Sequence, residues 1–204
     1  MRIAFIVEGK TERALVKYLK EFLRPRLPKQ MPKIDCSSYD GRIPTGEKLK
    51  KRVHHLLSGK QAADHVIALT DVYTGSNPPD FLDASDAIAK MTQWVGNNEK
   101  FHPHAAQYDF EAWLLPYWPT IQRLAGHNRT APSGNPEPVN HQNPPAHRLA
   151  EIFEIGRCRD SYVKPRDAGR ILRENDLHEA VQQYSQLKAL LNTILRISGG
   201  TVIP

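Results

Sequence analysis

Two short apolar runs, each followed by a carboxylate, constrain the fold of this 204-residue chain most strongly. Residues 3–7 are followed by Glu8 and Gly9, and residues 65–69 are followed by Thr70 and Asp71. Short apolar runs bounded by polar or turn residues are typical of strands that are buried on both faces. Helical spacing of apolar residues after Glu8 predicts a helix that returns the chain. The sequence therefore predicts an α/β fold with a mainly parallel, Rossmann-like sheet flanked by helices.

Weaker patterns predict the remaining elements. Strands are expected at residues 33–39 and 104–108, and helices at residues 13–29, 46–58, 83–95, about 146–156 and 177–196. Asp83 has the residue type of an N-cap. Residues 126–145 form a polar loop with five prolines, and loops of this length are usually functional or mobile. We expect one domain, residues 1–204, with a helical C-terminal extension, residues 146–204, packed on the same core.

The positive charge of the chain is concentrated in its first 60 residues. This segment holds 15 Lys and Arg against 6 Asp and Glu, a net charge of +9, whereas the whole chain carries +6. Such a segment favours a partner that bears phosphates, such as nucleic acid, although solvated helix faces explain the same residues. Two cysteines without ligand spacing, no signal-peptide layout and no long apolar run predict a cytoplasmic protein that does not contact a membrane.

Glu12 is expected on the inward face of the first helix. It lies three residues before Leu15 and seven before Leu19, which belong to the apolar side of that helix. Residues at these spacings share one helix face. We therefore expect Glu12 and Glu8 to face one another at the end of the first strand.

Carboxylates follow three of the expected strands. They are Glu8, Asp71 and the pair Asp109 and Glu111. Because the carboxyl ends of parallel strands lie on one edge of a sheet, these acids and Glu12 should converge there. Carboxylates at close range repel one another unless a cation is present, and their oxygens suit Mg²⁺ or Mn²⁺. All five are candidate metal ligands, although an Asp in these positions is also a common helix cap.

The order of several short motifs resembles the Toprim superfamily, which includes topoisomerase and primase catalytic domains and the OLD-family nucleases. The first motif is Val7-Glu8-Gly9-x-Thr11-Glu12, and Asp71 ends a later strand. The chain is also similar to a group of small Toprim-like bacterial proteins described as a domain of unknown function. The further motifs that carry this similarity are residues 71–75, 109–112, 136–145 and 162–164, together with Arg148-Leu149.

The resemblance implies roles for individual residues. Glu8 and Glu12 would be metal ligands, and Asp71 would be the first Asp of the family's Asp-x-Asp motif. The later acid pair falls near Asp109 and Glu111. The second Asp of the Asp-x-Asp motif is replaced by Tyr73 here, which puts two-metal catalysis in question.

Basic residues complete the expected site. The resemblance implies that Lys164 faces the scissile phosphate, and Glu8 is a candidate general base as well as a ligand. Lys10 and Arg148 are candidate phosphate contacts. Trp118, beside Pro119, is the tryptophan that we expect to be exposed, where it would offer a stacking surface for a base.

These observations lead to two hypotheses. The first is a phosphodiesterase that depends on Mg²⁺ or Mn²⁺, cuts nucleic acid, and works with an ATPase partner in prokaryotic defence. The second is a Toprim-like interaction subunit of an ABC- or SMC-type ATPase complex that does not hydrolyse its ligand. The choice between DNA and RNA, the number of metals and the possibility of a homo-oligomer stay open.

Overall fold

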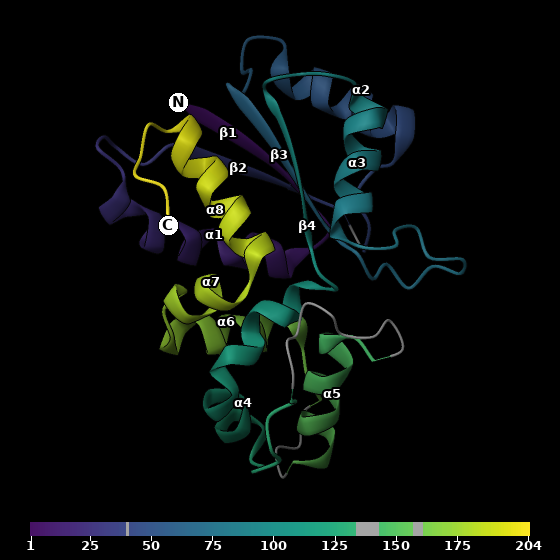
Figure 1. The fold of residues 1–204 in the computed structure, drawn as a ribbon, viewed down its shortest axis with the longest axis vertical. Helices are drawn as coiled ribbons and strands as arrows, with labels where there is room; N and C mark the ends of the chain where they lie inside the picture. Colours follow the sequence, from purple (N-terminus) through teal and green to yellow (C-terminus); the bar gives the residue numbers. More distant parts are fainter. Residues whose placement is uncertain (40, 134–142, 157–160) are drawn as a thin grey trace.

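The computed structural model describes residues 1–39, 41–133, 143–156 and 161–204, and its sheet has four parallel strands in the order β2-β1-β3-β4 (Figure 1). The strands are β1 (Arg2–Val7), β2 (Lys33–Ser38), β3 (His65–Asp71) and β4 (Phe101–Ala106). The expected α/β fold with a parallel sheet is therefore confirmed. Strand β4 differs from the expected residues 104–108, because its pairing with β3 begins at Phe101 and ends at Ala106.

Helices cover both faces of the sheet. Alternate residues of β1 belong to two separate buried clusters, as expected for a strand with apolar contacts on both sides. Helices α1 (Lys10–Leu23) and α8 (Ser185–Ile197) contribute to the cluster on one face. Helices α2 (Gly46–Leu57) and α3 (Ala84–Val95) contribute to the cluster on the other face (Figure 1).

A helical part lies beyond the end of β4, below the sheet in the view of Figure 1. Its elements are η2 (Phe110–Tyr117), α4 (Trp118–Ala125), α5 (Pro145–Ile155), α6 (Lys164–Glu174) and α7 (His178–Gln183). The buried cluster that contains β1 and α1 continues into these helices. Residues 134–142 of the Pro-rich loop lie outside the described residues, and they include residues 136–142 of the motif at residues 136–145.

Several helix expectations need correction. Helix α1 ends at Leu23, short of residue 29, because Pro25 has no N–H to continue the helix, and a short 3₁₀ turn, η1 (Arg24–Arg26), follows. The expected helix at residues 177–196 is two helices, α7 and α8, separated by Tyr184 in an extended conformation. The break lets α7 pack on η2 while α8 packs on β4. Helices α4 and α6 have no counterpart among the expected elements.

Other helix expectations are confirmed. Asp83 caps α3, since its Oδ1 accepts a hydrogen bond from the N–H of Asp86 at 2.8 Å. Helices α2 and α5 lie where the sequence predicts them. Within the part of the chain that the structure describes, no helix combines the length and the apolar character needed to cross a membrane.

Candidate metal centre

The carboxyl ends of β1, β3 and β4 bring five acidic side chains to one edge of the sheet. Glu8 directly follows β1, Asp71 ends β3, and Asp109 lies three residues after the end of β4. Glu12 is in the first turn of α1, and Glu111 is in η2. All five side chains are buried. We call them the acid cluster.

Strand order places Glu8 and Asp71 next to each other. Glu8 Oε1 accepts hydrogen bonds from Thr70 Oγ1 at 2.5 Å and from the N–H of Asp71 at 2.8 Å. Asp71 Oδ1 accepts the N–H of Phe110 at 3.0 Å. Among the described residues, no hydrogen-bond donor contacts Glu8 Oε2 or Asp71 Oδ2. These two oxygens are therefore available to a ligand.

Glu12 is buried and turned toward the strand end, as its spacing predicts. Its Oε2 accepts the N–H of Gly9 at 2.7 Å, which fixes the side chain across the turn between β1 and α1. The Glu12 charge raises the pKa of Glu8, so the two carboxylates act on each other at this edge.

Asp109 has a structural role that both of its oxygens serve. Oδ1 accepts the N–H of Ala112 at 3.2 Å, at the start of η2. Oδ2 accepts the N–H of Ala146 at 3.0 Å, in the first turn of α5. Asp109 therefore caps two elements, one through each oxygen.

Glu111 is joined to the residues that lead into α6. Lys164 Nζ lies 3.3 Å from both carboxylate oxygens of Glu111. Tyr162 Oη donates a hydrogen bond to Glu111 Oε1 at 3.3 Å. Lys164 is the first residue of α6 and brings an ammonium group to the acid cluster. The sequence pattern does not predict this helix.

Burial and mutual repulsion raise the pKa values of four acids at this edge, which are Glu8, Glu12, Asp71 and Asp109. Burial raises the pKa of Glu8 to about 7, with a further contribution from Glu12, against the opposing hydrogen bonds from Thr70 and Asp71. Burial and then the charge of Glu111 raise the pKa of Asp109 to about 8.

The same causes act on the pKa values of Asp71 and Glu12. Burial, followed by the charges of the neighbouring carboxylates, raises the pKa of Asp71 well above its ordinary value. Burial also raises the pKa of Glu12. The positive charge of Lys164 acts in the opposite direction on Glu8, Glu12 and Asp109.

The donor atoms suit a hard divalent cation, but the side chains do not yet form a ligand set. Across residues 1–39, 41–133, 143–156 and 161–204, no three His, Cys, Asp or Glu side chains are arranged to hold one metal ion. A divalent cation would accept the available oxygens of Glu8 and Asp71 as ligands. It would also favour the charged form of these two carboxyls, whose pKa values are raised without it. Binding would require side-chain rotation that turns these oxygens toward a common point.

The two candidate phosphate contacts lie in different places. Lys10 is exposed at the first position of α1, directly after the turn at the sheet edge. Arg148 lines a cavity of about 340 Å³ with Trp118, Arg129 and Glu151, and no member of the acid cluster lines this cavity. A phosphate contact at either residue stays a prediction.

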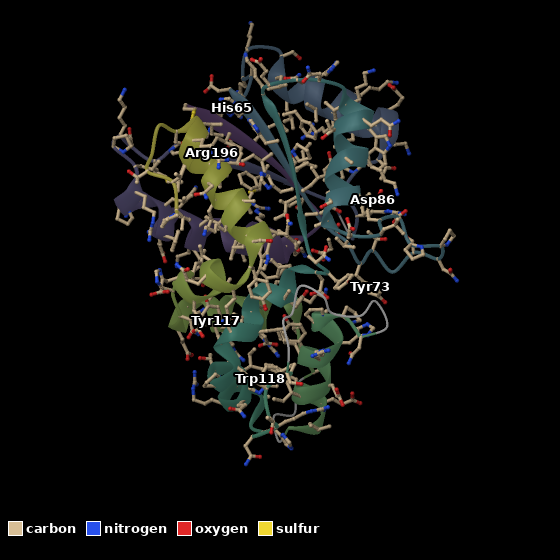
Figure 2. All side chains as sticks on the ribbon, in the orientation of Figure 1. His65, Tyr73, Asp86, Tyr117, Trp118 and Arg196 are labelled. Carbon is tan, nitrogen blue, oxygen red and sulfur yellow. The ribbon has the colours of Figure 1, made fainter. Side chains whose placement is uncertain are left out.

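The expectation for Trp118 is wrong. This side chain is buried between α4 and α5, and its Nε1 donates a hydrogen bond to the carbonyl of Arg129 at 2.8 Å (Figure 2). Its apolar ring belongs to the core of the helical part, and 5% of the residue is exposed.

Sequence reasoning missed two residues that contact the cluster. Thr70 precedes Asp71 directly and donates to Glu8, a contact that requires β1 and β3 to be neighbours. Tyr162 contacts Glu111, and the only signal for it is its place two residues before Lys164 in one of the resemblance motifs.

Comparison with solved structures supports the observed fold. The C-terminal region of the Burkholderia pseudomallei OLD protein is 16% identical, with a TM-score of 0.55 over 97% of this chain and 98% of that chain. Two structures of the C-terminal region of the Xanthomonas campestris pv. campestris OLD protein are 15% and 18% identical, each with a TM-score of 0.48. They cover 97% of this chain and 96% and 95% of theirs. At this identity the first similarity shows a shared fold.

No curated protein matches the sequence. A family described as "Domain of unknown function (DUF4276)" matches residues 7–195, from the last residue of β1 to the last turns of α8. The match therefore includes every member of the acid cluster and Lys164. Because it spans most of the sequence, the chain belongs to the DUF4276 family.

Proposed function

We propose that this protein is a phosphodiesterase that depends on Mg²⁺ or Mn²⁺ and acts on nucleic acid. The observation that carries the proposal is the buried acid cluster at the carboxyl ends of parallel strands, with Lys164 as its ammonium partner. Ionised carboxylates so close together need more positive charge than one ammonium supplies. The fold shared with an OLD C-terminal region and the Toprim-like order of motifs support the same conclusion.

Glu8, Glu12 and Asp71 are the proposed metal ligands. Glu8 and Asp71 each have an oxygen without a donor among the described residues, and Glu12 lies beside them. A bound divalent cation would polarise the phosphodiester and lower the pKa of an attacking water. Glu111 would join the ligands only where Lys164 moves away from it.

Lys164 is proposed to contact the scissile phosphate. Its side chain is about half exposed, whereas the carboxylate of Glu111 that it contacts is 1% exposed. The ammonium group therefore stands at the boundary between the acid cluster and solvent. From this position it would bind a non-bridging phosphate oxygen and offset the charge that develops on it during cleavage.

The basic segments at residues 13–29 and 46–60 are candidates to lie along the backbone of the substrate. Helix α1 packs on one face of the sheet and α2 on the other. Each follows a strand and begins at the edge where that strand ends. We therefore place the main substrate contacts at the first turn of α1, where Lys10 and Arg13 are exposed and which directly follows Glu8 and Gly9.

Cleavage assays test the proposal directly. Plasmid DNA and tRNA are incubated with Mg²⁺ or Mn²⁺ and with the wild type, Glu8→Ala or Glu21→Ala. Glu21 is an exposed residue of the same helix as Glu12 and serves as the matched control. We expect Glu8→Ala to lose about 100-fold or more of the activity and Glu21→Ala to retain it. Equal activity, or equal inertness, of wild type and Glu8→Ala would refute the proposal.

A second candidate is an interaction subunit that does not hydrolyse its ligand. Two observations favour it: Tyr73 stands where the resemblance predicts a second Asp, and no three acids in the described part of the chain form a ligand set. The partner proposed from the resemblance is an ABC- or SMC-type ATPase. Calorimetric titration with Mn²⁺ separates the candidates, because binding that is lost in Asp71→Ala excludes this one. Copurification with an ATPase and no Mn²⁺ binding would favour it.

A further inference from the structure

We propose that Tyr73 and His147 form a stacking platform for an unpaired nucleobase beside the acid cluster, so that the preferred substrate is single-stranded. The inference rests on the proposed function, because it assigns the substrate class of the same site. Tyr73 comes from the segment after β3, and His147 comes from the first turn of α5.

The two rings meet at the rim of the helical part. Their centroids are 5.8 Å apart, and the ring planes are inclined by 80°. In this perpendicular contact the partner ring covers at most one face of each ring. Figure 2 shows Tyr73 in the segment after β3, between the sheet and α5.

Neither ring serves the hydrophobic core. Tyr73 is half-buried and His147 is exposed. In the described parts of the chain, Tyr73 belongs to none of the buried hydrophobic clusters and is not packed against them. A partly exposed aromatic side chain without core contacts suits base stacking.

Backbone hydrogen bonds fix the platform relative to the acid cluster. The N–H of Tyr73 donates to the carbonyl of Tyr108 at 2.7 Å, directly before Asp109. The N–H of Ala146, next to His147, donates to Asp109 Oδ2 at 3.0 Å. Two residues of extended chain span at most about 7 Å, so the backbone of Tyr73 is close to that of Asp71.

A nucleotide whose base stacks on this platform would therefore lie beside the acid cluster. A base on the Tyr73 ring would have its own or the adjacent phosphate near Asp71 and Lys164. A paired base in a duplex is stacked on its neighbours and is not available to the platform. Tyr73 stands at the position of the second Asp of the Asp-x-Asp motif, and its role on this account is to position the single-stranded nucleic acid.

Binding measurements with three fluorescent probes test the platform. The probes are a short single-stranded thymidine oligonucleotide, an abasic oligonucleotide of the same length and a duplex, each titrated in Ca²⁺. The proteins are the wild type, Tyr73→Ala, Tyr73→Phe and His147→Ala, with thermal unfolding as a check that each variant is folded. The abasic probe keeps the phosphates but has no base to stack.

We expect Tyr73→Ala to bind the single strand about tenfold more weakly and to bind the abasic probe and the duplex like the wild type. Tyr73→Phe keeps the ring and should bind like the wild type, whereas His147→Ala should fall between the two. Equal loss on all three probes, no loss on the single strand, or no binding of any probe by the wild type would overturn the inference. If the wild type cuts nucleic acid while Tyr73→Ala has no selective effect, only the platform fails and the proposed function stands.

Discussion

Two hydrogen-bond donors favour the charged form of the Glu8 carboxyl, whereas burial and a neighbouring carboxylate disfavour that form. Thr70 and the N–H of Asp71 donate hydrogen bonds to its Oε1, which lowers the pKa of the carboxyl. Burial and the charge of Glu12 act against them and bring the pKa to about 7. The metal-free protein therefore carries at this position a carboxylate whose ionisation destabilises the folded state.

We predict that Glu8→Gln stabilises the metal-free protein at about pH 8, by about 1 to 3 kcal/mol. The pKa of Glu8 is raised on folding from 4.5 to about 7, so its favourable contribution is complete below about pH 4.5 and is lost as the pH rises through 7. Urea unfolding in EDTA at several pH values measures this difference, which should vanish at about pH 4.

The exposed Glu21→Gln serves as the control for this measurement, since it should show no such dependence on pH. A Glu8→Gln protein that is less stable than the wild type at about pH 8 would show that the hydrogen bonds outweigh burial and repulsion.

At the scale of elements, Asp109 joins the helical part to the sheet edge. It caps η2 through Ala112 and the first turn of α5 through Ala146, and it is 1% exposed. The two capped segments are far apart in the sequence, and residues 126–144 connect α4 to α5. One buried carboxylate therefore sets the position of elements that flank the acid cluster.

We predict that Asp109→Ala lowers the free energy of unfolding by about 2 to 4 kcal/mol, because two N–H groups lose their acceptor. Asp83→Ala is the matched comparison, since Asp83 caps one helix, α3, at a more exposed position, and should cost about 1 kcal/mol. Chemical denaturation of both variants measures the difference. Equal effects of the two substitutions would contradict the double-cap role of Asp109.

The sequence predicts those helices and strands whose buried residues form a regular pattern of apolar side chains along the chain. The strands β1 and β3 are apolar runs because both faces of the sheet are covered, and Glu12 is found because Leu15 and Leu19 mark the inward face of α1. Helix α6 escapes detection because its buried residues include Asp167, which accepts the N–H of Val163, so the apolar stripe is short.

Other features depend on partners that are distant in the sequence. The break at Tyr184 follows from the different packing of α7 and α8, which no local pattern encodes. The contact of Glu8 with Thr70 requires β1 and β3 to be neighbours in the sheet. The pairing of Lys164 with Glu111 requires α6 to begin beside the acid cluster.

At the scale of the whole molecule, the acids are buried at one edge and the basic residues lie outside it. The first 60 residues carry a net charge of +9, which is distributed over helices on opposite faces of the sheet. Within this segment, the exposed Lys10 and Arg13 at the start of α1 are next in the sequence to Glu8 and Glu12. A nucleic acid that reaches the cluster would therefore contact a limited number of these charges.

We predict that charge reversal at the sheet edge weakens binding of nucleic acid more than the same reversal elsewhere. Lys10→Glu should weaken binding several-fold and reduce the slope of log affinity against log salt by about 1, measured between about 50 and 200 mM salt. Lys29→Glu makes an equal change in net charge at an exposed position beyond the far end of α1, and it should have little effect. Equal losses in the two variants would indicate that only net charge matters.

The most direct test of the metal site is anomalous diffraction from crystals soaked in Mn²⁺. We predict one peak of anomalous density between Glu8 and Asp71, with oxygens of both side chains as ligands, and no such peak in Asp71→Ala crystals treated in the same way. Absence of a peak at this edge in the wild type, with Lys164 still paired with Glu111, would contradict the assignment of the acid cluster as a metal centre.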